Sequence, residues 1–150
     1  MRPHGFTLLE VLVSMLVLSI GLLGLAGLLA TNVRNNHSAY YRSQATWLAY
    51  DLIDRIRVNR QNAINGQYNI ALAATLPSTA TMSGIDLNDW KATLARVLPA
   101  GDGSVAVVPV VMVPPIVPSP SATVTVIIRW DDSRGTGGNN LQQFQMDTRL

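Results

Sequence analysis

One apolar run, long enough to cross a membrane, constrains this chain more than any other feature. No charged side chain occurs from Val11 to Val33. A helix needs about 20 consecutive apolar residues to span a hydrocarbon core of roughly 30 Å. Glu10 lies directly before the run, and no Lys or Arg lies within a helical turn of it. Because an ionised side chain inside a bilayer costs about 2.5–3.5 kcal/mol, Glu10 needs a partner.

Cleavage between Gly5 and Phe6 would supply that partner. It creates an ammonium at Phe6, close enough to pair with a carboxylate at Glu10 in the same chain or in a neighbouring one. Residues 5–10 read Gly-Phe-Thr-Leu-Leu-Glu and follow a short leader that contains Arg2. A secretory signal peptide is instead cut after its apolar region, at an Ala-x-Ala-like site that this run matches poorly.

The order of basic leader, Gly, Phe, Glu and apolar run resembles the class III signal of type IV prepilins and pseudopilins. The resemblance implies that a prepilin peptidase cuts after Gly5 and methylates Phe6. It also implies that Glu10 pairs with a Phe6 ammonium and sets the axial register of assembled subunits. A plain signal anchor and an uncleaved secretory peptide are the other interpretations of these residues.

Three glycines, Gly21, Gly24 and Gly27, lie inside the apolar run. Each costs about 0.5–1 kcal/mol relative to Ala in a helix interior. Their spacing of three does not fit a GxxxG dimer motif, although glycine also allows close packing in membrane helices. The resemblance implies instead that this part of the helix melts or stretches as subunits enter a fibre. Both interpretations remain open.

A second helical pattern follows the apolar run, and no proline occurs between His4 and Leu76. The sequence predicts one helix from Phe6 to about Asn62. Opposite charges fall at helical spacing in the pairs Asp51–Arg55 and Asp54–Arg57. One face repeats apolar residues with the i, i+3/i+4 spacing of a buried helical stripe: Tyr41, Ala45, Leu48, Ala49, Leu52, Ile53 and Ile56.

Residues 40–45, 49–57 and 130–135 are similar to minor pilins called type IV pilus modification (PilV) proteins. This likeness implies an α+β, type IV pilin-like fold. Its long N-terminal helix, with a transmembrane half and an amphipathic half, would pack on a small antiparallel β-sheet head. The expected division is a leader at 1–5, a transmembrane and assembly half at 6–33, and an exported head at 34–150.

The remaining elements of the head follow from turn residues and periodicity. Asn65-Gly66 is expected to end the first helix, and residues 68–83 to form a loop. A helix is predicted over 86–98 with Asp86 as its cap and Leu87, Trp90, Leu94 and Val97 on one face. A turn at Asp102-Gly103 would precede a strand at 105–108. The proline-rich segment 109–120 suits an edge or an extended surface loop, and its function is not indicated. Alternation predicts a hairpin of strands 123–130 and 144–150.

The residue types of the chain do not indicate an enzyme. There is no cysteine, so neither a disulfide nor a thiolate metal site is expected. His37, the only histidine after the cut, is interpreted as solvated, and Asp131 and Asp132 as turn residues. No catalytic, cofactor-binding or metal-binding residue is predicted. A net charge of +2 does not favour nucleic acid as a partner, and three helix arginines are interpreted as solvated or subunit-pairing: Arg55, Arg57 and Arg60.

The sequence therefore predicts a minor pilin, a non-catalytic subunit that primes, assembles or caps type IV pili. The implied partners are other minor pilins, the major pilin, the prepilin peptidase and the inner-membrane assembly platform. Before assembly it would cross the inner membrane once, with Arg2 keeping the N-terminus cytoplasmic and the head periplasmic. Afterwards it would lie in a surface fimbrium of the kind used for adhesion and twitching motility. The alternatives are a type II secretion minor pseudopilin and a membrane-anchored exported enzyme or binding protein.

Overall fold

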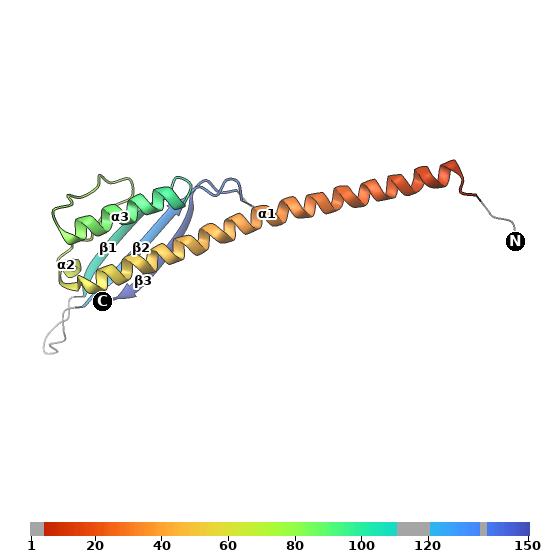
Figure 1. Ribbon diagram of the computed structural model, residues 1–150. Helices are drawn as coiled ribbons and strands as arrows, with labels where there is room; N and C mark the ends of the chain where they lie inside the picture. Colours follow the sequence, from red (N-terminus) through yellow and green to blue (C-terminus); the bar gives the residue numbers. More distant parts are fainter. Residues whose placement is uncertain (1–4, 111–120, 136–137) are drawn as a thin grey trace.

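In the computed structural model, a long helix carries a small α+β head on its C-terminal half (Figure 1). The structure describes residues 5–110, 121–135 and 138–150. This architecture confirms the predicted combination of a long N-terminal helix and a small antiparallel sheet. In chain order the elements are α1 (Leu8–Val58), α2 (Arg60–Ile64), α3 (Met82–Val97), β1 (Asp102–Val110), β2 (Ser121–Trp130) and β3 (Gln142–Arg149).

Helix α1 begins two residues later than predicted, because Thr7 caps it. The Thr7 backbone is extended, and its hydroxyl accepts a hydrogen bond from the Glu10 N–H at 3.3 Å. The predicted end at about Asn62 was also wrong, since α1 stops at Val58 and α2 follows. The interruption is Asn59, whose side chain donates to the Tyr68 hydroxyl at 3.0 Å and accepts from Asn62 at 2.8 Å. Such side-chain bonds compete with regular helix.

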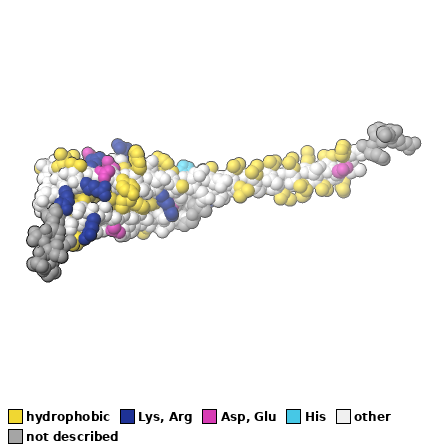
Figure 2. Space-filling view, turned by 90° about the horizontal axis from the view of Figure 1, so that it is seen from below, with side chains coloured by type: hydrophobic (Ala, Val, Ile, Leu, Met, Phe, Trp, Pro, Cys, Tyr) yellow, Lys and Arg dark blue, Asp and Glu magenta, His cyan; other side chains and the backbone are white. Residues whose placement is uncertain are grey.

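The N-terminal half of α1 projects from the head without any contact to it (Figure 1). Every residue from 5 to 37 is exposed, and Ser38 is the first that is partly covered. With 51 residues, α1 is about 76 Å long. By length and composition it is able to cross a membrane, and hydrophobic side chains line its projecting half (Figure 2). The division into leader, membrane half and exported head stays a prediction.

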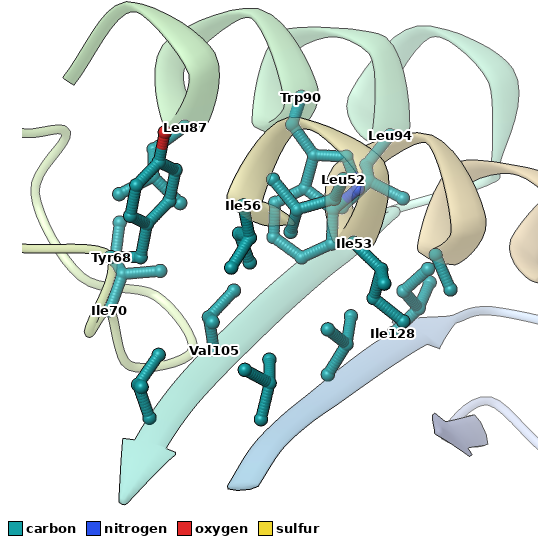
Figure 3. Close-up of a cluster of buried hydrophobic side chains, with 14 of the residues drawn as sticks. Leu52, Ile53, Ile56, Tyr68, Ile70, Leu87, Trp90, Leu94, Val105 and Ile128 are labelled. Carbon is teal, nitrogen blue, oxygen red and sulfur yellow. The ribbon is translucent and has the colours of Figure 1, made fainter. Parts of the chain in front are cut away.

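The C-terminal half of α1 supplies one wall of the core, which α3 and the sheet complete (Figure 3). The predicted stripe is confirmed. Tyr41 and Leu48 pack at its margin, and the other members are buried: Ala45, Ala49, Leu52, Ile53 and Ile56. The indole N–H of Trp90 also donates to the Leu48 carbonyl at 3.0 Å, which fixes α3 against the spine of the head.

Helix α3 starts four residues before the predicted position. The Thr81 hydroxyl accepts from the Gly84 N–H at 3.1 Å and caps the helix. Asp86 is therefore not the cap, as predicted, but a buried residue inside α3. The predicted apolar face is confirmed, with Leu87, Trp90 and Leu94 buried and Val97 partly covered. The segment before α3 is irregular as expected, apart from one bridge between Ile70 and Val105.

The three strands form an antiparallel sheet in the order β1-β2-β3. Strand β1 begins at Asp102, so the predicted turn at Asp102-Gly103 was wrong. Asp102 pairs with Arg129 and Gly103 with Ile128. Gly103 is needed there, because a Cβ would lie 2.3 Å from the Trp90 ring. Pro109 ends up in this edge strand, which fits the edge interpretation of its segment, while residues 111–120 lie outside the described residues.

Strands β2 and β3 form the predicted hairpin, with Thr123 opposite Arg149 and Trp130 opposite Gln142. The period of two in β2 is confirmed by burial. One set of its side chains faces α1 and α3 and is at most 2% exposed: Val124, Val126, Ile128 and Trp130.

Candidate functional site

The residues before α1 are open to other molecules. Gly5 and Phe6 precede the helix outside any regular secondary structure, and Phe6 is 82% exposed. An added Cβ at Gly5 would meet no atom within 4 Å. No contact within the described chain therefore requires glycine at this position, and the peptide bond between Gly5 and Phe6 is accessible.

Glu10 lies in the first turn of α1 with its carboxylate unused. Its backbone N–H is bound by Thr7, but no residue in the described parts of the chain gives its carboxylate a hydrogen bond or an ion pair. The pattern Thr7-x-x-Glu10 is that of a capping box, a local signal that sequence reasoning missed. An acid at this position also interacts favourably with the positive end of the helix dipole.

Apolar side chains surround Glu10 on the same face of the helix. With Ser14, it lies in a shallow groove between Leu9, Val13, Val17 and Leu18. All of these side chains are exposed. A contiguous apolar surface of this length is stable only against lipid or against another protein. The unpaired acid is thus embedded in a surface that a second molecule must cover.

Helix α1 runs unbroken through Gly21, Gly24 and Gly27. A Cβ at any of the three would meet nothing within 4 Å. The fold of the single chain therefore does not explain why glycine occurs at these positions, and helix melting stays a prediction.

A buried polar network joins α1 to α3 inside the head. Asp86 accepts from the Tyr68 hydroxyl at 2.6 Å and from Arg55 at 3.5 Å. Burial, reinforced by the hydrogen bond to Asp86, raises the pKa of Tyr68 to about 12. A tyrosine that holds its proton this firmly is a poor acid catalyst near neutral pH. The network ties two helices together.

Two of the three arginines at the end of the long helical segment have acidic partners. Arg55 pairs with Asp51 at 3.0 Å and Arg57 with Asp54 at 3.0 Å, as predicted from spacing. Arg55 also lies 3.9 Å from Asp89, and Arg60 has an interaction of its own. Arg55 and Arg57 therefore neutralise neighbouring carboxylates.

The loop between β2 and β3 packs against α1. Asp132 is buried and accepts a hydrogen bond from the Ser38 hydroxyl. The Oδ1 atom of Asp131 accepts from the Ser133 N–H at 2.8 Å, and this bond holds the pKa of Asp131 below its usual value. The turn-forming interpretation of Asp131 is thereby confirmed. Sequence reasoning missed the contact with Ser38, because nothing local marks two residues so far apart as neighbours.

His37 is exposed beside this loop, with its ring centre 6.4 Å from that of Tyr41. Among the described residues, no group of three or more His, Cys, Asp or Glu side chains is placed to hold a metal ion. The polar side chains of the described head thus serve its internal packing and ion pairing. The projecting helix, by contrast, presents an apolar surface that nothing in the described chain covers.

An exposed apolar helix carrying a small α+β head is the form of a membrane-anchored assembly subunit. The prokaryotic N-terminal methylation motif matches residues 1–26, and the type IV pilin Tt1218 family matches residues 27–86. The chain belongs to the type IV pilins. No curated protein matches it, and no solved structure does.

The raised pKa of Tyr68 predicts a loss of stability at alkaline pH. The unfolded chain loses this proton near pH 10 and the folded chain near pH 12. The stabilisation is therefore complete below pH 10 and disappears as pH rises to 12, with a slope of at most about 1.4 kcal/mol per pH unit. Urea unfolding in detergent, followed by circular dichroism from pH 8 to 12, measures this loss.

The matched variants are Tyr68→Phe and Tyr50→Phe, since Tyr50 is 53% exposed. Tyr68→Phe should cost about 1–3 kcal/mol at pH 8, because buried Asp86 loses its donor, and its curve should be flatter above pH 10. Tyr50→Phe should follow the unsubstituted chain. Parallel curves for all three proteins would contradict the assignment.

Proposed function

We propose that this type IV pilin is a minor pilin, a structural subunit that prepilin peptidase cuts between Gly5 and Phe6. Its role would be to prime, assemble or cap the fibre. The observation that carries the proposal is Glu10, an unpartnered acid one helical turn from Phe6 on an uncovered apolar helix. Assignment to the PilV-like minor pilins is supported by the similarity of residues 40–45, 49–57 and 130–135.

Processing changes the electrostatics at the start of α1. The mature chain would begin at Phe6, one residue before the Thr7 cap. A positive charge there opposes the helix dipole, and methylation of an amine keeps that charge. The Glu10 carboxylate offsets it, either in the same chain or in the neighbouring subunit. Pairing between subunits fixes their relative height along the fibre axis.

The exposed stripe supplies the rest of the assembly contact. Lipid tails are as apolar as leucine, so helices leave lipid for one another through close packing and polar contacts rather than a hydrophobic drive. An ion pair involving Glu10 is such a polar contact. In hydrocarbon it is favoured because each charge alone is costly. The peptide bond after Gly5 is accessible, and no contact within the described chain requires glycine at this position. Both observations fit recognition of this bond by a peptidase.

The proposed location before assembly is the inner membrane, with the N-terminus in the cytoplasm and the head in the periplasm. Arg2 favours this orientation, whereas Arg34 and Arg42 on the other flank act against it. The orientation therefore rests on the processing signal as well as on charge. The proposed partners are the prepilin peptidase, the assembly platform, other minor pilins and the major pilin, in whose fibre the chain would reach the cell surface.

Glu10→Gln tests the register contact. It removes the charge and nearly preserves the shape, so cleavage after Gly5 should proceed while incorporation into fibres falls at least about tenfold, the effect of roughly 1.4 kcal/mol. Immunoblots of sheared fibres and of membranes measure both steps. Glu10→Asp keeps the charge and should recover part of the incorporation. Normal incorporation of Glu10→Gln would rule out the register contact.

Combined replacement of Gly21, Gly24 and Gly27 by Ala tests helix melting. Each change stabilises the helix by about 0.5–1 kcal/mol, and no atom within 4 Å obstructs the added methyl groups. The variant should insert and be processed normally but enter fibres less efficiently. Ala26→Leu and Ala30→Leu lie in the same segment and serve as controls for added bulk. Unchanged incorporation of the triple variant would mean that melting is not required.

A further inference from the structure

We propose that the end of the head nearest the projecting half of α1 binds anionic lipid headgroups through Arg34, Arg42, Arg96 and Arg134. These four residues are called the basal rim. The inference rests on the proposed insertion of α1 into a membrane, and it adds a lipid contact for the head itself.

Two of the four arginines lie on α1 where the helix leaves its apolar half. Arg34 directly follows Val33, the end of the uncharged run. Arg42 lines a hollow together with Asn35 and Ser38 of the same helix. Both arginine side chains are exposed.

The other two arginines lie in α3 and in the β2–β3 loop, which both reach the same part of α1. Arg134, in the β2–β3 loop, lines a pocket with His37 and Tyr41 of α1. Arg96 lies in the last turn of α3, next to Val97, which lines a groove with Val33. Figure 1 shows the end of α3 and the β2–β3 loop on the side of the head that faces the projecting helix.

The rim carries excess positive charge. None of its four arginines has an ion-pair partner among the described residues, in contrast to Arg55, Arg57 and Lys91. Arg129 and Arg149 also lack one, but they lie on separate strands and do not form a cluster at this end of the head. Two carboxylates lie nearby. Asp132 is buried against Ser38, and Asp131 accepts from the Ser133 N–H and is also stabilised by the charge of Arg134. Four exposed guanidinium groups against two occupied carboxylates leave the surface net positive.

The rim begins at the height of the headgroup layer. That layer is about 5–7 Å thick on each side of the hydrocarbon core. At a rise of about 1.5 Å per residue, Arg34 lies inside it, whereas the backbone of Arg42 lies about 14 Å above Val33. Side chains of a helix tilt toward its N-terminus, so the long side chain of Arg42 extends toward the layer. Tyr40, two residues after Ser38, is 54% exposed, and tyrosine is enriched at membrane interfaces.

The nearest surface to the rim before assembly is thus the bilayer that α1 crosses. Guanidinium groups bind phosphate oxygens through paired hydrogen bonds. Each arginine near an anionic membrane surface strengthens attachment about fivefold. The contact would hold the head down on the bilayer, and extraction of the subunit into a fibre would break it.

A fluorescence measurement on the full chain in vesicles tests this. The chain has no cysteine, so a single label can be placed at Asn140→Cys in the β2–β3 loop or at Val58→Cys. Val58 is 90% exposed at the far end of α1 and serves as the control. Headgroup-linked quenchers in phosphatidylcholine vesicles, with and without phosphatidylglycerol, report how closely each label approaches the bilayer.

The label at residue 140 should be quenched more strongly when phosphatidylglycerol is present, and the difference should vanish in about 1 M salt, where the Debye length is about 3 Å. The label at residue 58 should not respond. Gln at all four rim positions should abolish the difference. Each single Arg→Gln change should weaken the attachment about fivefold and so lower the salt concentration at which the difference disappears. Arg149→Gln, an exposed residue at the other end of the sheet, should have no effect.

Equal quenching in neutral and anionic vesicles, or a fourfold variant that behaves like the unsubstituted chain, would overturn the inference. Alkaline carbonate extraction separates this failure from failure of the proposed function. A chain that resists extraction but ignores lipid charge overturns the lipid contact alone. A chain that is extracted is not inserted, which overturns the membrane location and the lipid contact together.

Discussion

The packing of one helical stripe supports the whole molecule. Ala45, Ala49 and Leu52 are buried completely between α3 and the sheet. With no disulfide in the chain, this contact holds the head to α1 together with the polar network around Asp86 and the hydrogen bonds Trp90–Leu48 and Ser38–Asp132. Helix α1 is therefore both the core of the head and the stalk that carries it. Any force on the projecting half is transmitted directly to the head's core.

The two halves of α1 differ in whether their apolar side chains are buried within the chain. Its C-terminal half finds its apolar partners within the chain, whereas its N-terminal half leaves all of its apolar side chains uncovered. In the proposed function, lipid would cover that half before assembly and neighbouring subunits would cover it afterwards. Under this proposal Glu10 would distinguish the two environments, because a charge tolerated poorly in lipid would gain a partner between subunits. The fold of a type IV pilin thus follows from a helix that a single chain can only half bury.

Regular periodicity was the part of the fold that sequence reasoning could predict. The stripe on α1 and the alternation in β2 were both confirmed, because burial follows spacing directly. Where tertiary contacts decide, prediction was wrong. Asp86 has the chemistry of a cap, but Tyr68 and Arg55 bind it inside the helix. Gly103 has the chemistry of a turn, but it pairs with Ile128 in β1, and its missing Cβ leaves room for the Trp90 ring. The roles of Gly5, Phe6 and Glu10 concern other molecules, so the fold of one chain cannot test them.

The most direct test is the mass of the N-terminal peptide of this chain in surface fibres sheared from the native host. The account predicts a peptide that begins at N-methylated Phe6, which would establish cleavage after Gly5, methylation and incorporation in one measurement. A chain that reaches the fibre fraction with residues 1–5 still attached would contradict it, since the Phe6 ammonium that Glu10 is proposed to bind would never form.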